Sequence, residues 1–148
     1  MARITNDDLA EVFNEMGDLL EIQGGDRYRI RAFRRAARVI ESLPEPVETM
    51  IRFGTLEKTP GIGAGTVHRL KQALRTGTCD DHRELRATLP SGLRDMLDVK
   101  GLGAKTVRTL WQTLKIGSVD ELEQAARAGR IRTLPRMGVF QSDFRFGV

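Results

Sequence analysis

Two glycine-rich turns, each leading into a predicted helix, carry the residues of this chain best suited to chemistry. Segments 59–70 and 99–110 align without gaps, and six of their twelve positions are identical. In each copy a Gly-apolar-Gly turn opens the helix, so free backbone N–H groups at its positive end can bind an anion. Two such sites in 148 residues with a net charge of +4 suit successive phosphates of a nucleic-acid backbone.

Each glycine of a turn has its own predicted task. The first, Gly61 or Gly101, permits a tight reversal, and the second, Gly63 or Gly103, lets a phosphate approach without a β-carbon in the way. The same interface is predicted to include Gly65, Thr66 and Arg69 after the first turn, and Lys105, Thr106 and Arg108 after the second. The alternative is that each turn merely joins two packed helices. A single short glycine motif would fit this alternative well, but two matching copies fit it less well.

Six arginines fall within residues 27–38, on a predicted helix that a cap at Asp26 begins. Four of them share one helical face, separate from an apolar stripe, at about 100° per residue. We interpret this face as a phosphate-binding stripe; the alternative is a solvated face that balances the acidic helix of residues 6–22. Tyr28 lies beside the cluster and could stack on an exposed base, or serve in capping or packing. The candidates from this helix are Tyr28, Arg29, Arg31, Arg34 and Arg35.

The elements that must position these groups are all helical. Apolar periodicity and capping residues predict helices at 6–22, 26–43, 47–53, 66–76, 80–88, 91–97, 105–114 and 118–129. No segment shows the alternation of apolar and polar residues that is typical of a strand. We therefore expect an all-α fold of tandem helix-hairpin-helix units in two small subdomains. No apolar run approaches the roughly 20 residues of a membrane span. The single cysteine excludes an internal disulfide and fits a cytoplasmic, nucleoid-associated protein.

Three segments in order, 27–37, 59–63 and 100–106, resemble the N-terminal region of bacterial family X DNA polymerases. The resemblance implies a lyase-like domain with the first hairpin at 1–78, a second helix-hairpin-helix subdomain at 79–134, and a divergent tail at 135–148. It also implies sequence-nonspecific binding to gapped, nicked or 5′-phosphorylated DNA in repair. The family's catalytic palm has no counterpart in this sequence, so we expect no polymerase activity from it.

The resemblance further implies a monovalent cation, Na⁺ or K⁺, at each hairpin. Its ligands would be the backbone carbonyls of Glu57, Thr59 and Ile62, and of Leu97, Val99 and Leu102. The family's lyase lysine corresponds to Arg69, whose guanidinium is a very poor imine-forming nucleophile, so no catalytic residue is predicted. Two alternatives stay open: an abasic-site lyase that uses Lys71 or Lys58, and an interaction module for a separate catalytic chain.

Overall fold

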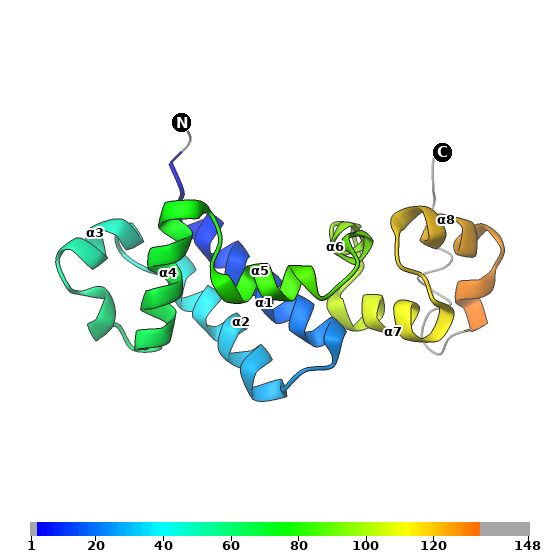
Figure 1. The fold of residues 1–148 in the computed structure, drawn as a ribbon, viewed down its shortest axis with the longest axis horizontal. Helices are drawn as coiled ribbons and strands as arrows, with labels where there is room; N and C mark the ends of the chain where they lie inside the picture. Colours follow the sequence, from blue (N-terminus) through cyan, green and yellow to red (C-terminus); the bar gives the residue numbers. More distant parts are fainter. Residues whose placement is uncertain (1–2, 134–148) are drawn as a thin grey trace. The chain divides into compact units, whose positions relative to one another are not determined.

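The computed structural model describes residues 3–133, and helices joined by short loops make up this part of the chain (Figure 1). The α-helices are α1 (Asn6–Gln23), α2 (Arg27–Glu41), α3 (Val47–Arg52), α4 (Ala64–Thr76), α5 (Asp80–Ala87), α6 (Ser91–Leu97), α7 (Ala104–Leu114) and α8 (Val119–Arg127), with 3₁₀ turns η1 (Leu56–Lys58) and η2 (Arg130–Thr133). No strand occurs in these residues, which confirms the predicted all-α class. None of their helices has the length and apolar character needed to cross a membrane. The predicted tail at 135–148 lies outside the described residues.

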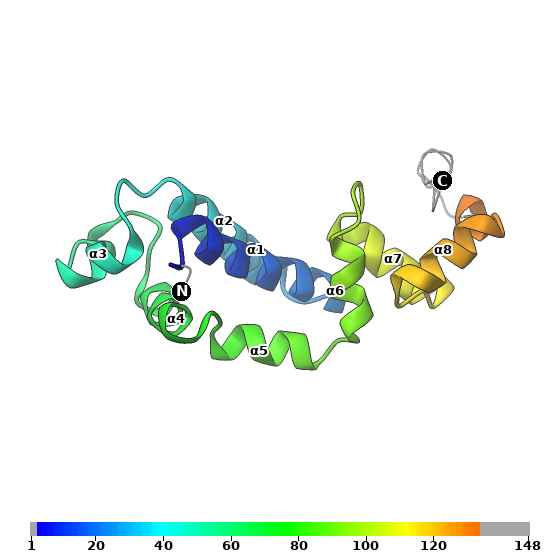
Figure 2. The same ribbon diagram turned by 90° about the horizontal axis from the view of Figure 1, so that it is seen from above.

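Helices α1 and α2 form the centre of the first unit and lie side by side in both views (Figures 1 and 2). Thr5 begins α1 with a capping box that includes Asp8, and Gly24 ends it with a φ of +77°. The two helices meet through buried aromatic rings, because Phe13 and Phe33 pack edge to face with centroids 6.4 Å apart. The apolar stripe predicted for α2 is buried and faces this core.

A buried histidine ties α5 to α1. His82 is 2% exposed, and its Nδ1 lies 2.8 Å from the hydroxyl of Thr78. Its Nε2 lies 3.1 Å from Oε2 of Glu15, an electrostatic contact without hydrogen-bond alignment. Arg86 donates to both oxygens of the same carboxylate at 3.1 and 3.0 Å. Burial acts to raise the pKa of Glu15, but the contacts with His82 and Arg86 prevail and lower that pKa to about 2.

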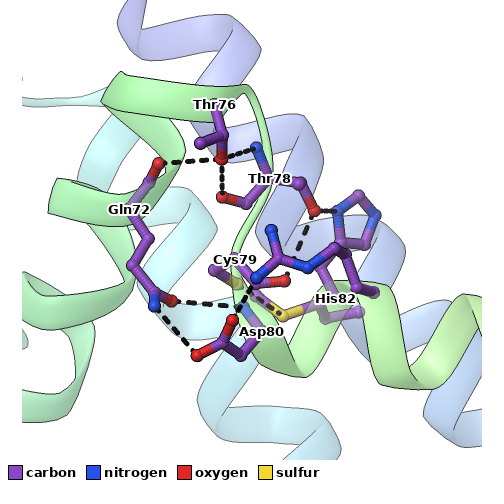
Figure 3. A network of polar contacts seen from close by, with 8 residues as sticks. Gln72, Thr76, Thr78, Cys79, Asp80 and His82 are labelled. Atoms are coloured by element: carbon purple, nitrogen blue, oxygen red, sulfur yellow. Dashed lines mark hydrogen bonds and ion pairs between the residues drawn. The ribbon is translucent and has the colours of Figure 1, made fainter.

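The turn between α4 and α5 is held by side chains from both helices (Figure 3). Gln72 donates to Oδ2 of Asp80 at 2.9 Å and accepts from the Asp80 backbone N–H at 3.1 Å. The hydroxyl of Thr76 donates to the carbonyl oxygen of Thr78 at 2.9 Å. These contacts connect α5 to α4, and both helices belong to the first of two compact units, which meet between Thr88 and Leu89 in the chain.

The second unit contains α6, α7, α8 and η2 around a small apolar core. Ser118 begins α8 by accepting a hydrogen bond from the Glu121 N–H at 3.1 Å. In α6, Gly92 lies so close to the backbone of Gly117 that a β-carbon there would overlap the Gly117 carbonyl oxygen. This contact lets α6 approach the segment that leads into α8. The core of the unit includes Leu93, Met96, Val107, Leu110, Ile116, Leu122 and Ala125.

Candidate nucleic-acid interface

The two hairpins adopt the same backbone conformation, although they lie in different units. Gly61 has a φ of +90° and Gly101 a φ of +89°, a region that glycine enters without steric cost. The N–H groups of Ile62 and Leu102 each donate to the carbonyl three residues earlier, at 3.1 Å in both cases. Both apolar side chains are 6% exposed and anchor their turns in the core. The sequence repeat therefore encodes a structural repeat.

The second glycine of each hairpin leaves the start of the next helix open. Gly63 and Gly103 are the N-cap residues of α4 and α7, and neither supplies a side-chain hydrogen bond to the first turn. By contrast, Thr5, Asp26 and Ser118 cap α1, α2 and α8 with side-chain oxygens. A β-carbon on either glycine would meet nothing within 4 Å. The N-cap residues of α4 and α7 therefore leave the first-turn N–H groups without a side-chain partner, and such groups can bind an anion.

The first hairpin packs directly on α2. A β-carbon on Gly61 would lie 2.9 Å from Cγ2 of Val39, whereas one on Gly101 would meet nothing within 4 Å. Tyr28, Arg35 and Val39 follow one another along a single ridge of α2, because they are spaced seven and four residues apart. Tyr28 is 81% exposed, which excludes a packing role for its ring. One surface thus runs from Tyr28 past Arg35 to the first hairpin.

Side chains from α2, α4 and α5 meet near the start of α4. This group, here called the hairpin-1 cluster, contains three charged residues and two uncharged ones: Arg29, Arg69, Asp81, Phe33 and Gly65. The guanidinium carbons of Arg29 and Arg69 lie 5.6 and 5.4 Å from the centroid of the Phe33 ring. Arg69 donates through Nε to Oδ2 of Asp81 at 2.6 Å. Its Nη1 is near Gly65, since a β-carbon there would lie 3.2 Å away. The predicted site residues Arg29, Gly65 and Arg69 therefore come together.

Sequence reasoning had not connected Asp81 to this cluster. The sequence does place a positive charge, Arg69, before the turn at Gly77 and a negative charge, Asp81, after it. This turn ends α4 before α5 begins. Two helices joined by such a short turn bring their facing side chains together, and here they join Asp81 to Arg69.

Arg34 and Arg35 are adjacent in sequence but have different surroundings. Arg34 contacts Asp18 at 2.9 Å and Glu21 at 2.5 Å, both on α1. Burial acts to lower the pKa of Arg34, but its hydrogen bonds to Glu21 and Asp18 raise it above its ordinary value. The alternative of a basic face that balances acidic α1 therefore applies to Arg34. Arg31 and Arg35 are exposed and form no ion pair within residues 3–133.

This difference yields a matched pair of variants. Arg35→Ala should lower DNA affinity several-fold without changing stability, because an exposed cation near a phosphate contributes mainly to binding. Arg34→Ala should leave DNA affinity nearly unchanged but cost about 1 kcal/mol of unfolding free energy, since two carboxylates lose their partner. Fluorescence anisotropy and urea denaturation measure the two effects. An equal loss of affinity in both variants would refute the distinction.

The predicted contacts of the second hairpin lie on α7. Lys105 is exposed in the first turn, and Thr106 and Arg108 are half-buried. Thr66 is half-buried at the matching place on α4. In the hairpin loops, Thr59 and Val99 hold equivalent carbonyls that accept the hydrogen bonds from the buried apolar residue.

Lys71, one of the two lysines of the lyase alternative, lies on another face of α4 than Arg69. It lines a cavity of about 430 Å³ with Glu57, Gly63 and His68, on the face of α4 that does not carry Arg69. No group of three or more His, Cys, Asp or Glu residues in the described chain could hold a metal ion. Cys79 is buried with its Sγ 3.7 Å from the Met16 sulfur, and burial raises the pKa of its thiol.

Comparisons with known proteins agree with this architecture. Residues 4–79 match the helix-hairpin-helix domain, and residues 93–139 match the SAM-like helix-hairpin-helix tandem. DNA polymerase/3′-5′ exonuclease PolX of Bacillus subtilis (strain 168) is 25% identical over 131 residues, 88% of this chain, and the chain spans 22% of the length of that relative. Tandem helix-hairpin-helix domains bind DNA without sequence specificity, so DNA is the partner that this architecture supports. The chain belongs to the helix-hairpin-helix domain family.

Proposed function

We propose that this chain binds the phosphate backbone of gapped or nicked DNA in repair. The observation that carries the proposal is the pair of hairpins with one backbone conformation, each opening an uncapped helix start beside basic side chains. Backbone N–H groups and arginines contact phosphates, which carry no base information. The similarity to PolX of Bacillus subtilis supports a role in repair.

In this proposal the hairpin N–H groups, together with Lys105 and Arg108, hold phosphates at two places. Arg31 and Arg35 extend the first contact along α2. Tyr28, exposed at the end of the same ridge, stacks on a base that a gap leaves unpaired. An unpaired base is what distinguishes a gap from an intact duplex for a protein that otherwise contacts only the backbone.

We propose that each hairpin also holds a monovalent cation. The carbonyl oxygens of Thr59 and Val99 each accept one backbone hydrogen bond, and a carbonyl oxygen has a second lone pair. A bound Na⁺ or K⁺ would supply positive charge between the loop and a phosphate. The two loops should respond equally to replacement of the cation, because their geometry is the same.

Fluorescence anisotropy on labelled DNA tests the proposed function. The probes are a one-nucleotide gap, a nick and an intact duplex, each in two unrelated sequences. We expect tighter binding to the gap than to the duplex, no difference between sequences, and a loss of at least about tenfold between 50 and 200 mM salt. Binding that depends on sequence, or that changes little with salt, would contradict the proposal.

A further inference from the structure

The two hairpin turns differ at one exposed position. Each turn spans four residues, 59–62 or 99–102, and closes with a hydrogen bond of 3.1 Å from its last N–H to its first carbonyl. The third residue of each turn is a glycine with a positive φ, of +90° or +89°, and proline is common as the second residue of such turns. The first hairpin has Pro60 at this position, whereas the second has Lys100, and both are exposed.

The stability of the turn does not explain Lys100. Within residues 3–133 its N–H donates no backbone hydrogen bond, so proline could take its place without the loss of one. Proline at a compatible position also restricts the unfolded chain and thereby stabilises the folded protein. The ammonium group of Lys100 forms no ion pair in the described residues. This lysine therefore presents a cation to solvent without a partner in the described fold.

Lys105 adds a second positive charge on the other side of the same turn. It is exposed in the first turn of α7, at the place that Gly65 occupies in the first hairpin. Segment 97–105 has a net charge of +1 even with the carboxylate of Asp98, whereas the net charge of segment 57–65 is zero. The second hairpin therefore carries a net positive charge of its own, and the first does not.

The first hairpin has basic side chains beside it on another helix. Its turn packs on Val39 of α2, and the exposed Arg35 lies one helical turn away on the same ridge. A β-carbon on Gly101 would meet nothing within 4 Å in residues 3–133, so no described side chain packs on the second turn as Val39 packs on the first. One backbone geometry is thus combined with two different sources of positive charge.

We propose that Lys100 is a further DNA-binding residue, and that Lys100 and Lys105 let the second hairpin bind phosphate without the arginines that serve the first. This inference rests on the proposed function, because it takes the anion to be a DNA phosphate. A lysine attracts a phosphate as a point charge and reads no base, so Lys100 contributes equally to binding of a gap and of an intact duplex. Each phosphate that it neutralises releases counterions, which makes the contact dependent on salt.

Matched losses of one positive charge test the contact. Lys100→Gln should bind gapped and intact duplex DNA about fivefold less tightly at about 100 mM salt, and its slope of log K against log salt should be less steep by about 0.9. The control is Lys115→Gln. Lys115 is exposed in the same unit, about 15 Å along α7 from Lys105 and so beyond the screening length of about 8 Å. This control should bind within about twofold of the wild type.

A second variant separates binding from folding. Lys100→Pro gives the second turn the residue of the first, removes the same charge and leaves Gly101 in place. It should unfold at the same urea concentration as the wild type or at a higher one, and still lose about fivefold in affinity. Lys100→Arg keeps the charge and should bind as the wild type does. A purely structural role for Lys100 would instead make stability and affinity change together.

Three results would overturn the inference. Equal affinities and salt slopes of the wild type, Lys100→Gln and Lys115→Gln would show that Lys100 does not contact DNA. Equal losses in the two glutamine variants would show an effect of net charge in place of a contact. A wild type that does not bind DNA at low salt, or binds it without salt dependence, would remove the proposed function together with the inference, and so is distinguishable from the first two results.

Discussion

Replacing the second glycine of both hairpins by aspartate should strongly weaken DNA binding while the fold is kept. Gly63 and Gly103 have extended N-cap conformations, with φ of −97° and −92°, and open space where a β-carbon would be. Aspartate is among the most favourable N-cap residues, so the variant should be as stable as the wild type or slightly more stable. Its carboxylate would bond the N–H groups that a phosphate needs and would repel that phosphate. We expect the double variant to lose about 100-fold in affinity, roughly tenfold per hairpin.

The matched control is the double replacement of the same glycines by asparagine. Asparagine caps a helix about as well as aspartate but carries no charge, so it should cause an intermediate loss of affinity. Anisotropy at low salt gives the affinities, and thermal unfolding followed by circular dichroism gives the stabilities. Undiminished binding by the aspartate variant, with a normal melting temperature, would show that the hairpin N–H groups do not contact DNA.

Gly92→Ala should destabilise the second unit by about 3 kcal/mol. A β-carbon at this position would overlap the backbone carbonyl oxygen of Gly117, and it would lie close to the Cα of Ser118 as well. Backbone cannot move aside as a side chain can, so α6 would have to shift away from the start of α8. Alanine has a higher helix propensity than glycine by about 1 kcal/mol, which offsets only part of the cost.

Urea denaturation of Gly92→Ala measures this effect, and Gly65→Ala is the control. Gly65 lies in the first turn of α4, where the nearest atoms to a new β-carbon belong to the end of the Arg69 side chain. That flexible group can shift, so the control should be neutral or more stable. If both variants unfold at the wild-type urea concentration, the close approach at Gly92 does not limit stability.

Local signals were enough to predict the helices and the hairpins. Asp26 caps the helix that the sequence assigned to it, and α1 ends at Gln23, one residue beyond its predicted end. The paired Gly61 and Gly101 adopt the positive φ that the turns require. These features depend on neighbours within a few residues, which a single sequence displays directly.

The ion pairs of the candidate site could not be predicted, because they depend on which side chains of different helices come into contact. Helical spacing places Arg34 and Arg35 on the same face, and only the position of α1 shows that one is paired and the other is not. The contact of Asp81 with Arg69 requires the relative rotation of α4 and α5, which hydrophobic periodicity does not determine. The contact of the buried His82 with Glu15, which connects α5 to α1, likewise has no distinctive sequence pattern.

The two hairpins impose different limits on how their sequences can change. Gly61 and Gly101 share one backbone conformation, but only Gly61 faces a neighbour, Val39, closely enough to exclude a side chain. At Gly101 a β-carbon would meet no neighbour within 4 Å in residues 3–133, so the constraint there is the left-handed backbone, which asparagine tolerates better than other residues that have side chains. Substitution can therefore alter the turn of the second hairpin without disturbing its surroundings. The same change in the first hairpin would separate it from α2 and from the arginines beside it, so the two repeats are equal in shape but unequal in mutational freedom.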